Sequence, residues 1–170
     1  MIEITKYSRL DRETRETLEH YIENEFEHIP IVKETEWAKP DWTIIYYLDK
    51  EIVSFYNIIE RVISIDNLDA KIAGINNVIT PKEFRGKGYA SRILKETESL
   101  IFEDLKSDLG VLLCADNLVP FYERLNWYKI NCPVYFSQST GKKVWGANAM
   151  ILSKKEKIFP SSMELNGLPW

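Results

Sequence analysis

The stretch that decides the fold is NVITPKEFRGKGYA, residues 77–90. It begins as an apolar, β-branched run typical of a strand, and Gly86 and Gly88 interrupt it just before a helical periodicity starts. Glycine permits a tight turn and lets a ligand approach bare amide groups. The first N–H groups of a helix lack internal partners and carry the positive end of its dipole. The stretch therefore predicts a strand–turn–helix unit whose turn can bind a pyrophosphate.

Two other phosphate-binding motifs do not fit this turn. In a Walker A loop, Pro81 would hold the place of the first glycine and Gly88 that of the Ser or Thr. In a Rossmann fingerprint, Ser91 would hold the place of the third glycine. Arg85 and Lys87 add positive charge beside the glycines. Taken alone, the pattern leaves open a glycine turn that merely opens a helix.

The segments around this unit predict a sheet. Three runs rich in β-branched and aromatic residues precede the glycines and are expected to form an antiparallel meander: Trp42–Leu48, Glu51–Ile65 and Ala70–Thr80. After them, an apolar face recurs at helical spacing from Ile93 to Leu105. The almost wholly apolar run Leu109–Cys114 is typical of a strand buried on both faces. The unit from Ala70 to Cys114 should then be parallel with a right-handed crossover.

The rest of the chain adds shorter elements. We expect a strand at Ile2–Ile4, a helix that begins near Ser8 and Asp11 and fades at Asn24, and an irregular or broken helical stretch over residues 25–40. A short helix near Val119–Leu125 and strands at Trp127–Ile130 and Val144–Ser153 complete the pattern. The predicted architecture is a mixed α/β sheet with helices on both faces, built as a single domain over residues 1–170.

Composition bounds the function. The 170 residues are 45% hydrophobic, and 22 basic against 26 acidic side chains give a net charge of −4. This balance argues against a nucleic-acid partner, which needs a basic surface, and permits a cationic substrate. With only His20 and His28, no His-rich metal site is expected. Cys114 and Cys132 are expected to be reduced thiols of a cytoplasmic protein, and neither a signal peptide nor a membrane span is visible.

Two segments resemble the motifs of one family. The stretch 77–90 resembles motif A of the GNAT superfamily of N-acetyltransferases, whose signature Gln/Arg-x-x-Gly-x-Gly/Ala is met by Arg85, Gly88 and Ala90. Residues 119–127, VPFYERLNW, look like motif B, with Asn126 where the family usually has glycine. Asparagine tolerates the left-handed geometry that such a position needs. Two motifs in the right order, about 35 residues apart, are more specific than either alone.

The resemblance implies the GNAT fold, in which acetyl-CoA binds between two parallel strands that splay apart. These would be Ala70–Thr80 and Leu109–Cys114. Backbone groups of Val78, Ile79 and Thr80 would then hold the pantetheine and polarise the thioester carbonyl, and Asn117 would meet the pantetheine arm or the thiol end. The pyrophosphate would bind to six consecutive residues: Arg85, Gly86, Lys87, Gly88, Tyr89 and Ala90.

The same resemblance assigns a general acid but no base. In the family, the tyrosine at the position of Tyr122 protonates the leaving thiolate, and a phenol with a pKa of about 10 suits that task. Many relatives carry a glutamate on the strand that leads into motif A, where this chain has Asn76, which cannot take a proton. Glu60 and Asp66 are nearby carboxylates whose orientation the sequence leaves open.

The second half resembles the aminoglycoside 2′-N-acetyltransferase branch. The matching pieces are residues 112–114, residues 119–122, the run VYFSQ at 134–138 followed by Gly141, and the apolar end at 167–170. In that branch a carboxy-terminal tryptophan and its carboxylate can face the cationic substrate, so Trp170 is a candidate for the acceptor site. Trp37, within an acidic segment, is a second candidate, because acidic groups and aromatic rings suit a polyamine or aminosugar.

We therefore expect an acetyl-CoA-dependent N-acetyltransferase that acts on a small amine. Two other functions remain open from the sequence: a CoA-binding sensor that has lost catalysis, which Asn76 favours and Tyr122 opposes, and an acetyltransferase for protein N-termini or lysines. A homodimer is compatible with the sequence, which does not decide the oligomeric state.

Overall fold

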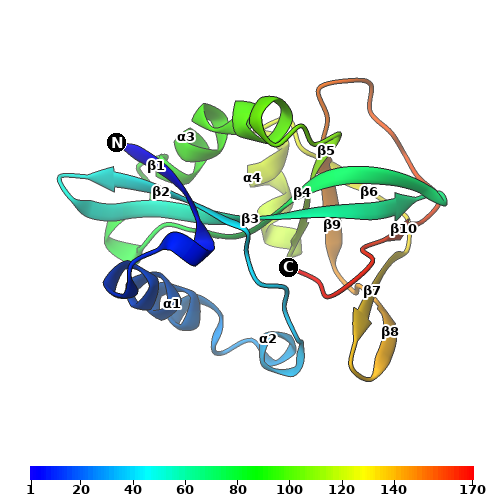
Figure 1. Ribbon diagram of the computed structural model, residues 1–170, viewed down its shortest axis with the longest axis horizontal. Coiled ribbons are helices and arrows are strands. Elements are labelled where there is room, and N and C mark those ends of the chain that lie inside the picture. The colour runs from blue at the N-terminus through cyan, green and yellow to red at the C-terminus, as the bar shows by residue number, and fades with distance from the viewer.

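The computed structural model of the chain describes residues 1–170, and a ten-stranded mixed sheet forms its centre (Figure 1). The strands run in the order β6-β9-β5-β4-β3-β10-β7-β8, and β1 and β2 extend the sheet through pairing of β2 with β3. Their bounds are β1 Ile2–Lys6, β2 Trp42–Leu48, β3 Glu51–Ile65, β4 Leu68–Ile79, β5 Leu109–Cys114, β6 Tyr128–Ile130, β7 Val134–Gln138, β8 Gly141–Val144, β9 Asn148–Leu152 and β10 Met163–Glu164.

Helices cover both faces of the sheet, as predicted. The α-helices are α1 Arg12–Phe26, α2 Pro30–Glu34, α3 Tyr89–Glu96 and α4 Val119–Glu123, and short 3-10 segments lie at Tyr7–Arg9, Lys82–Phe84 and Asp116–Leu118. In Figure 1, α3 lies on one side of β3 and α1 with α2 on the other. The apolar face of α3 and the side chains of α4 share one core cluster, whereas Leu18 of α1 packs on the opposite face with Phe55 and Ile79.

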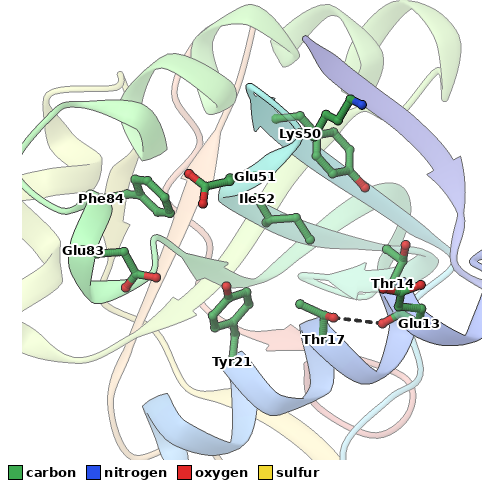
Figure 2. Close-up of a pocket in the computed structure, with 10 residues that line it drawn as sticks. Glu13, Thr14, Thr17, Tyr21, Lys50, Glu51, Ile52, Glu83 and Phe84 are labelled. Carbon is green, nitrogen blue, oxygen red and sulfur yellow. Dashed lines mark hydrogen bonds between the residues drawn. The ribbon is translucent and has the colours of Figure 1, made fainter.

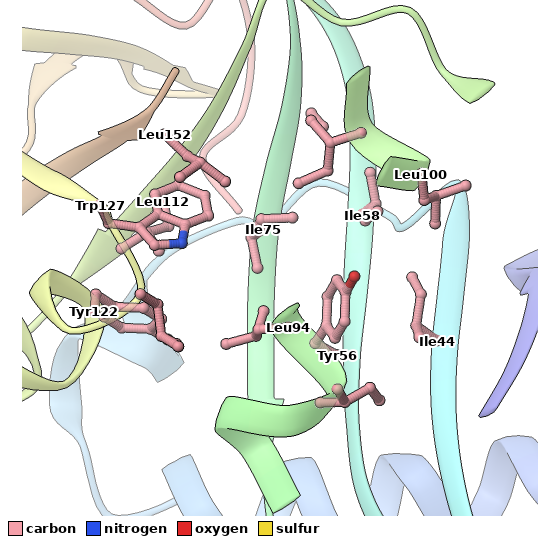
Figure 3. Packing of buried hydrophobic residues seen from close by; sticks show 14 of the residues in the cluster. Ile44, Tyr56, Ile58, Ile75, Leu94, Leu100, Leu112, Tyr122, Trp127 and Leu152 are labelled. Carbon is pink, nitrogen blue, oxygen red and sulfur yellow. The ribbon is translucent and has the colours of Figure 1, made fainter. Parts of the chain in front are cut away.

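The main core cluster lies between the sheet and the α3–α4 layer. Figure 3 shows Ile44 of β2 at one end of this cluster and Trp127 with Tyr122 of α4 at the other. A buried polar contact joins the cluster to α3, where the hydroxyl groups of Tyr56 and Thr97 are 2.5 Å apart. Thr97 also ends α3, since its hydroxyl donates to the Ile93 carbonyl at 2.6 Å.

Three sequence expectations need correction. The helix expected through Leu105 stops at Glu96 and is followed by one π-helical turn, Leu100–Asp104. The amino-terminal helix is capped by Asp11 rather than by Ser8, because the Asp11 carboxylate accepts the Thr14 N–H at 2.9 Å. The strand expected at Val144–Ser153 is two strands, β8 and β9, since residues 145–147 leave the sheet.

The parallel pair of β4 and β5 is confirmed, and it is short. Register pairing runs from Ile72 with Leu109 to Ile75 with Leu112 and then stops. Both strands continue beyond this point, β4 along β3 and β5 along β9. Where β4 leaves β5, it contains one extra residue relative to β3. Asn77 has a φ of +51° there, and the register between β3 and β4 shifts. Such a bulge bends its strand, so β4 and β5 diverge after Ile75.

Two tryptophans lie against glycines in the middle of the paired segment of β4 and β5. The Trp170 ring covers Gly74 of β4 on the face of α1, and the Trp127 ring covers Gly110 of β5 on the face of α3. A Cβ atom at Gly110 would lie 2.9 Å from the Trp127 ring, and one at Gly74 would overlap the Trp170 ring. Both glycines are therefore required by close approach of a ring, which secures the paired part of β4 and β5 from both faces.

Candidate functional site

The glycine turn is an open loop at the start of α3. Gly86 and Gly88 have φ values of +75° and +77°, and a Cβ atom added at either would meet no atom within 4 Å. Gly88 is the N-cap of α3 and offers no side-chain cap, so the first N–H groups of the helix are left for another acceptor. Arg85 and Lys87 are exposed beside them. The loop therefore has the free amides, space and positive charge that a pyrophosphate needs.

Arg85 already has two partners. Its Nε donates to the Thr80 carbonyl at 2.9 Å, and its Nη2 forms an ion pair with Glu25 near the end of α1. This ion pair ties the helix on one face of the sheet to the glycine loop at its edge. Sequence reasoning missed Glu25 as a partner, because no local pattern relates two residues that are 60 positions apart.

The end of β4 is held by β3. Ser54 donates its hydroxyl to the Ile79 carbonyl at 3.0 Å and accepts the Thr80 hydroxyl at 3.1 Å. Of the three residues expected to hold the pantetheine, Ile79 and Thr80 have carbonyls that accept hydrogen bonds within the chain, whereas Val78 lies in the bulge without a register partner.

Tyr122 lies in the core cluster close to the end of β5. Its side chain is 6% exposed and packs edge-on against Phe121 and Trp127, at ring-centroid distances of 4.9 and 6.2 Å. Burial raises its pKa well above the usual range, with a smaller contribution from Cys114. Burial also raises the pKa of the Cys114 thiol to about 11. Both groups are therefore protonated at neutral pH, and Tyr122 has a proton to give.

Asn117 is exposed, and the two candidate carboxylates, Glu60 and Asp66, are bonded to other residues of the chain. Asn117 is exposed in the short 3-10 segment after β5. Glu60 accepts the Trp42 indole N–H at 2.8 Å and pairs with Lys71 at 3.4 Å. Asp66, in the turn between β3 and β4, accepts the N–H groups of Ser161 and Ser162 at 2.8 and 2.9 Å. Structural partners therefore occupy both carboxylates.

Trp170 and Trp37 lie on the same side of the sheet as α1. Trp170 is 3% exposed, and its indole N–H donates to the Val111 carbonyl at 3.3 Å. The segment before it is tied down, since Arg61 donates to the carbonyls of Leu165 and Leu168 at 3.2 and 2.6 Å. Trp37 is half-buried and stacks edge-on with Trp145 at 6.1 Å. Their roles toward an acceptor stay predictions.

The loop that carries Trp37 also contacts the β7–β8 hairpin. Glu36 and Gln138 exchange backbone and side-chain hydrogen bonds at 2.9 and 3.0 Å, and the Glu36 carboxylate accepts the Ser139 N–H at 2.7 Å. The Ala38 N–H donates to the Pro169 carbonyl at 2.8 Å. The α2–β2 loop, the hairpin and the carboxy-terminal segment thus form one continuous cover on this side.

Two cavities lie elsewhere on the surface of the molecule. One, of about 280 Å³, lies between α1, the β2–β3 turn and the segment before Arg85 (Figure 2). Glu13, Glu51 and Glu83 line it against a single cation, Lys50, so it is unsuited to a phosphate. The other, of about 490 Å³, lies where β5 and β6 end and β9 begins, and is lined by residues 115–116, 129–132 and 146–148.

The matching family model is described as an acetyltransferase (GNAT) domain and covers residues 2–130. The chain belongs to the GNAT acetyltransferase family. Membership makes it an acetyltransferase, and the GNAT fold expected from the sequence is confirmed. The expected acetyl-CoA co-substrate agrees with solved neighbours that hold acetyl-CoA or CoA. No match was found among the curated proteins. No helix of this GNAT chain has both the length and the apolar character to span a membrane.

Solved structures share the fold at low identity. A GNAT family N-acetyltransferase (YhbS) from Escherichia coli in complex with CoA aligns with a TM-score of 0.61 at 10% identity, over 98% of this chain and 89% of its own. A GNAT family acetyltransferase from Brucella melitensis with acetyl-CoA gives 0.57 at 10%, over 96% and 94%. A probable N-acyltransferase from Enterococcus faecalis gives 0.55 at 18%, and this chain, with 75% aligned, spans only 32% of it.

Proposed function

We propose that this GNAT chain transfers an acetyl group from acetyl-CoA to a primary amine of a small cationic molecule, with residues 1–170 acting as one catalytic domain. The observation that carries the proposal is the combination of an open, cationic glycine loop at one end of the β4–β5 splay with a protonated Tyr122 beside Cys114 at the end of β5. Residues 131–170 fall outside the family match, yet β7 to β10 join the same sheet, which favours one unit.

In the proposed reaction, the chain binds the pyrophosphate on residues 85–90 and the pantetheine arm along Val78. The neutral amine forms a bond to the thioester carbonyl carbon, and the carbon–sulfur bond breaks. Tyr122 gives its proton to the departing thiolate and regains one from solvent, while the proton lost by the nitrogen goes to water. Burial keeps the Tyr122 phenol protonated at neutral pH, so its proton is present when the thiolate forms.

Three features support a small cationic acceptor, such as a polyamine or aminosugar. The chain carries a net charge of −4, which favours cations. The cover made by the α2–β2 loop and the β7–β8 hairpin, through the Glu36–Gln138 bonds, favours a small molecule over a peptide. The resemblance of residues 112–138 to the aminoglycoside 2′-N-acetyltransferase branch points the same way. In this role Trp37 would contribute a ring face, because a chain carbonyl already accepts its N–H group. The Trp170 ring is covered by Gly74 and Arg61, so Trp170 would act as part of the wall behind the acceptor.

A screen of primary amines with acetyl-CoA, followed as release of free thiol, tests the proposal. We expect turnover with at least one polyamine or aminosugar and little with peptides. Turnover with peptide N-termini or lysines alone would replace the proposed acceptor class. Binding of acetyl-CoA without thiol release from any amine would instead favour a CoA-binding sensor, for which the absence of a carboxylate at Asn76 is the supporting observation.

A further inference from the structure

A polar row crosses three strands of an otherwise apolar sheet face. Thr43 of β2 lies directly opposite Asn57 of β3, which lies opposite Asn76 of β4. Residues opposite one another in an antiparallel pair share a face, and here it is the face of α1. Apolar clusters border the row on both sides, one containing Phe55 and the other Ile59. The row is thus an isolated polar strip between two cores.

Two members of the row are fully buried and bonded to each other. Thr43 is 0% and Asn57 1% exposed, and the Thr43 hydroxyl donates to the Asn57 Oδ1 at 2.8 Å. Asn76 is partly buried, but its Oδ1 is shielded from solvent and no group of the chain donates to it. Burying an oxygen without a hydrogen-bond donor costs free energy. Since no group of the chain donates to Asn76 Oδ1, we look for a donor on a bound ligand.

The position of Asn76 tells where that donor would lie. It is the first residue of β4 beyond the last pair with β5, Ile75 with Leu112, so no β5 residue pairs with it. The bulged Asn77 follows directly, and Val78, the expected pantetheine contact, is two residues on. On the same face, Gly74 and the Trp170 ring close the paired end of the strands. The amide of Asn76 therefore borders the opening between β4 and β5.

We propose that Asn76 Oδ1 accepts a hydrogen bond from the N–H of the acceptor amine, so that Asn76 is a substrate-binding residue. This inference rests on the proposed function and adds the residue that orients the acceptor. Asn57, bonded to Thr43, lies opposite Asn76 on the neighbouring strand. An amide oxygen can hold an amine N–H but cannot take its proton, which makes Asn76 a binding group and not a base.

The test compares amine binding to the wild-type protein, Asn76→Leu and Ser107→Ala, all saturated with CoA. Ser107 is the matched control, because its Oγ is also buried without a partner but lies before β5, outside the polar row. The probes are spermidine and kanamycin, and their affinities are read from the dose dependence of the melting temperature. We expect Asn76→Leu to weaken amine binding about tenfold, the loss of one hydrogen bond, while Ser107→Ala leaves it unchanged.

A second readout separates binding from folding. Without ligand, Asn76→Leu should melt at or above the wild-type temperature, because an unpaired polar group is replaced by an apolar one of similar size. If Asn76→Leu does not fold, Asn76→Ala takes its place in the test and should show the same loss of amine affinity. Equal affinities in the wild type and both Asn76 variants, or no amine binding to the wild type, would overturn the inference. Thiol release by the wild type is measured separately. If thiol is released but the Asn76 variants keep the wild-type amine affinity, only this inference fails and the proposed function stands. If amine binding depends on Asn76 but no thiol is released, the result counts against the proposed function alone.

Discussion

The indole of Trp170 lies directly on Gly74, so no side chain fits between the ring and the strand. Gly74→Ala should therefore displace the ring and lower the free energy of unfolding by about 1–3 kcal/mol, the range for overpacked cores. Urea denaturation measures this change. The matched control is Gly146→Ala, since a Cβ atom at Gly146 meets nothing within 4 Å.

A double variant checks the cause. If the cost of Gly74→Ala comes from the Trp170 ring, the same substitution in a Trp170→Ala background should cost much less. Full additivity of the two changes would mean that the ring does not limit the space at Gly74.

The glycine loop is predicted to bind the pyrophosphate through its open amides. Gly88→Ala places a methyl group in that space, and we expect it to remove most of the rise in melting temperature that acetyl-CoA produces. The change also strains the backbone, because φ is +77° at this position. Gly141→Ala, at a φ of +112° in the β7–β8 turn, is the control for strain: it should lower the melting temperature of the free protein and keep the ligand-induced rise.

If Arg85 binds the pyrophosphate as proposed, its ion pair with Glu25 competes with the ligand for the same guanidinium. Glu25→Gln should release Arg85 and strengthen acetyl-CoA binding a few-fold, a modest effect because both side chains are partly exposed. Calorimetric titration measures the affinity. Glu16→Gln is the control, as it removes the same charge from the same helix but pairs only with Arg12. Weaker binding in Glu25→Gln would show that the pair holds Arg85 in place for the ligand.

Tyr122 should matter for turnover and little for binding. Tyr122→Phe removes only the hydroxyl, and thiol release should fall by about 10²–10⁴-fold while acetyl-CoA affinity stays near the wild-type value. Tyr56→Phe is the control in the same core cluster: it loses the bond to Thr97 and should reduce stability but not the rate per folded molecule.

The pH profile gives a separate check on Tyr122. Burial raises its pKa, so the phenol stays protonated through and above the usual value of about 10. The rate of the wild type should therefore rise with pH as the amine loses its proton and should not fall between pH about 8 and 10. A falling limb in that range, absent from Tyr122→Phe, would contradict a raised pKa.

Local sequence patterns were enough to predict the segments expected to bind the cofactor. The glycines of residues 86–88, the apolar run of β5 and the left-handed Asn126, with a φ of +66°, all follow from residue type and spacing. The sequence also held a signal for strand β7, because VYFSQ followed by a glycine turn is typical of a hairpin. The two-residue β10 has no local pattern, since its pairing with β3 and β7 comes entirely from distant segments.

The polar row at the proposed acceptor site depends on the register of the strands, which the sequence of one strand alone does not reveal. Thr43 and Asn57 are polar residues within apolar runs, a visible signal, yet only the alignment of β2, β3 and β4 brings them into one row with Asn76. A shift of one residue in any strand would turn its side chain to the other face. The Arg85–Glu25 pair depends in the same way on the packing of α1.

The anchoring of the carboxy-terminal segment by Arg61 has a consequence for the order of folding. Arg61 and Leu168 are 107 residues apart in the chain, and Ala38 with Pro169 spans a still longer separation. Closing such a long loop costs entropy that only the finished sheet can offset. The segment should therefore dock after β3, β4 and β5 have assembled and should be among the first parts to detach. Amide exchange in residues 163–170 would then report the opening of the acceptor side while the glycine loop keeps its structure.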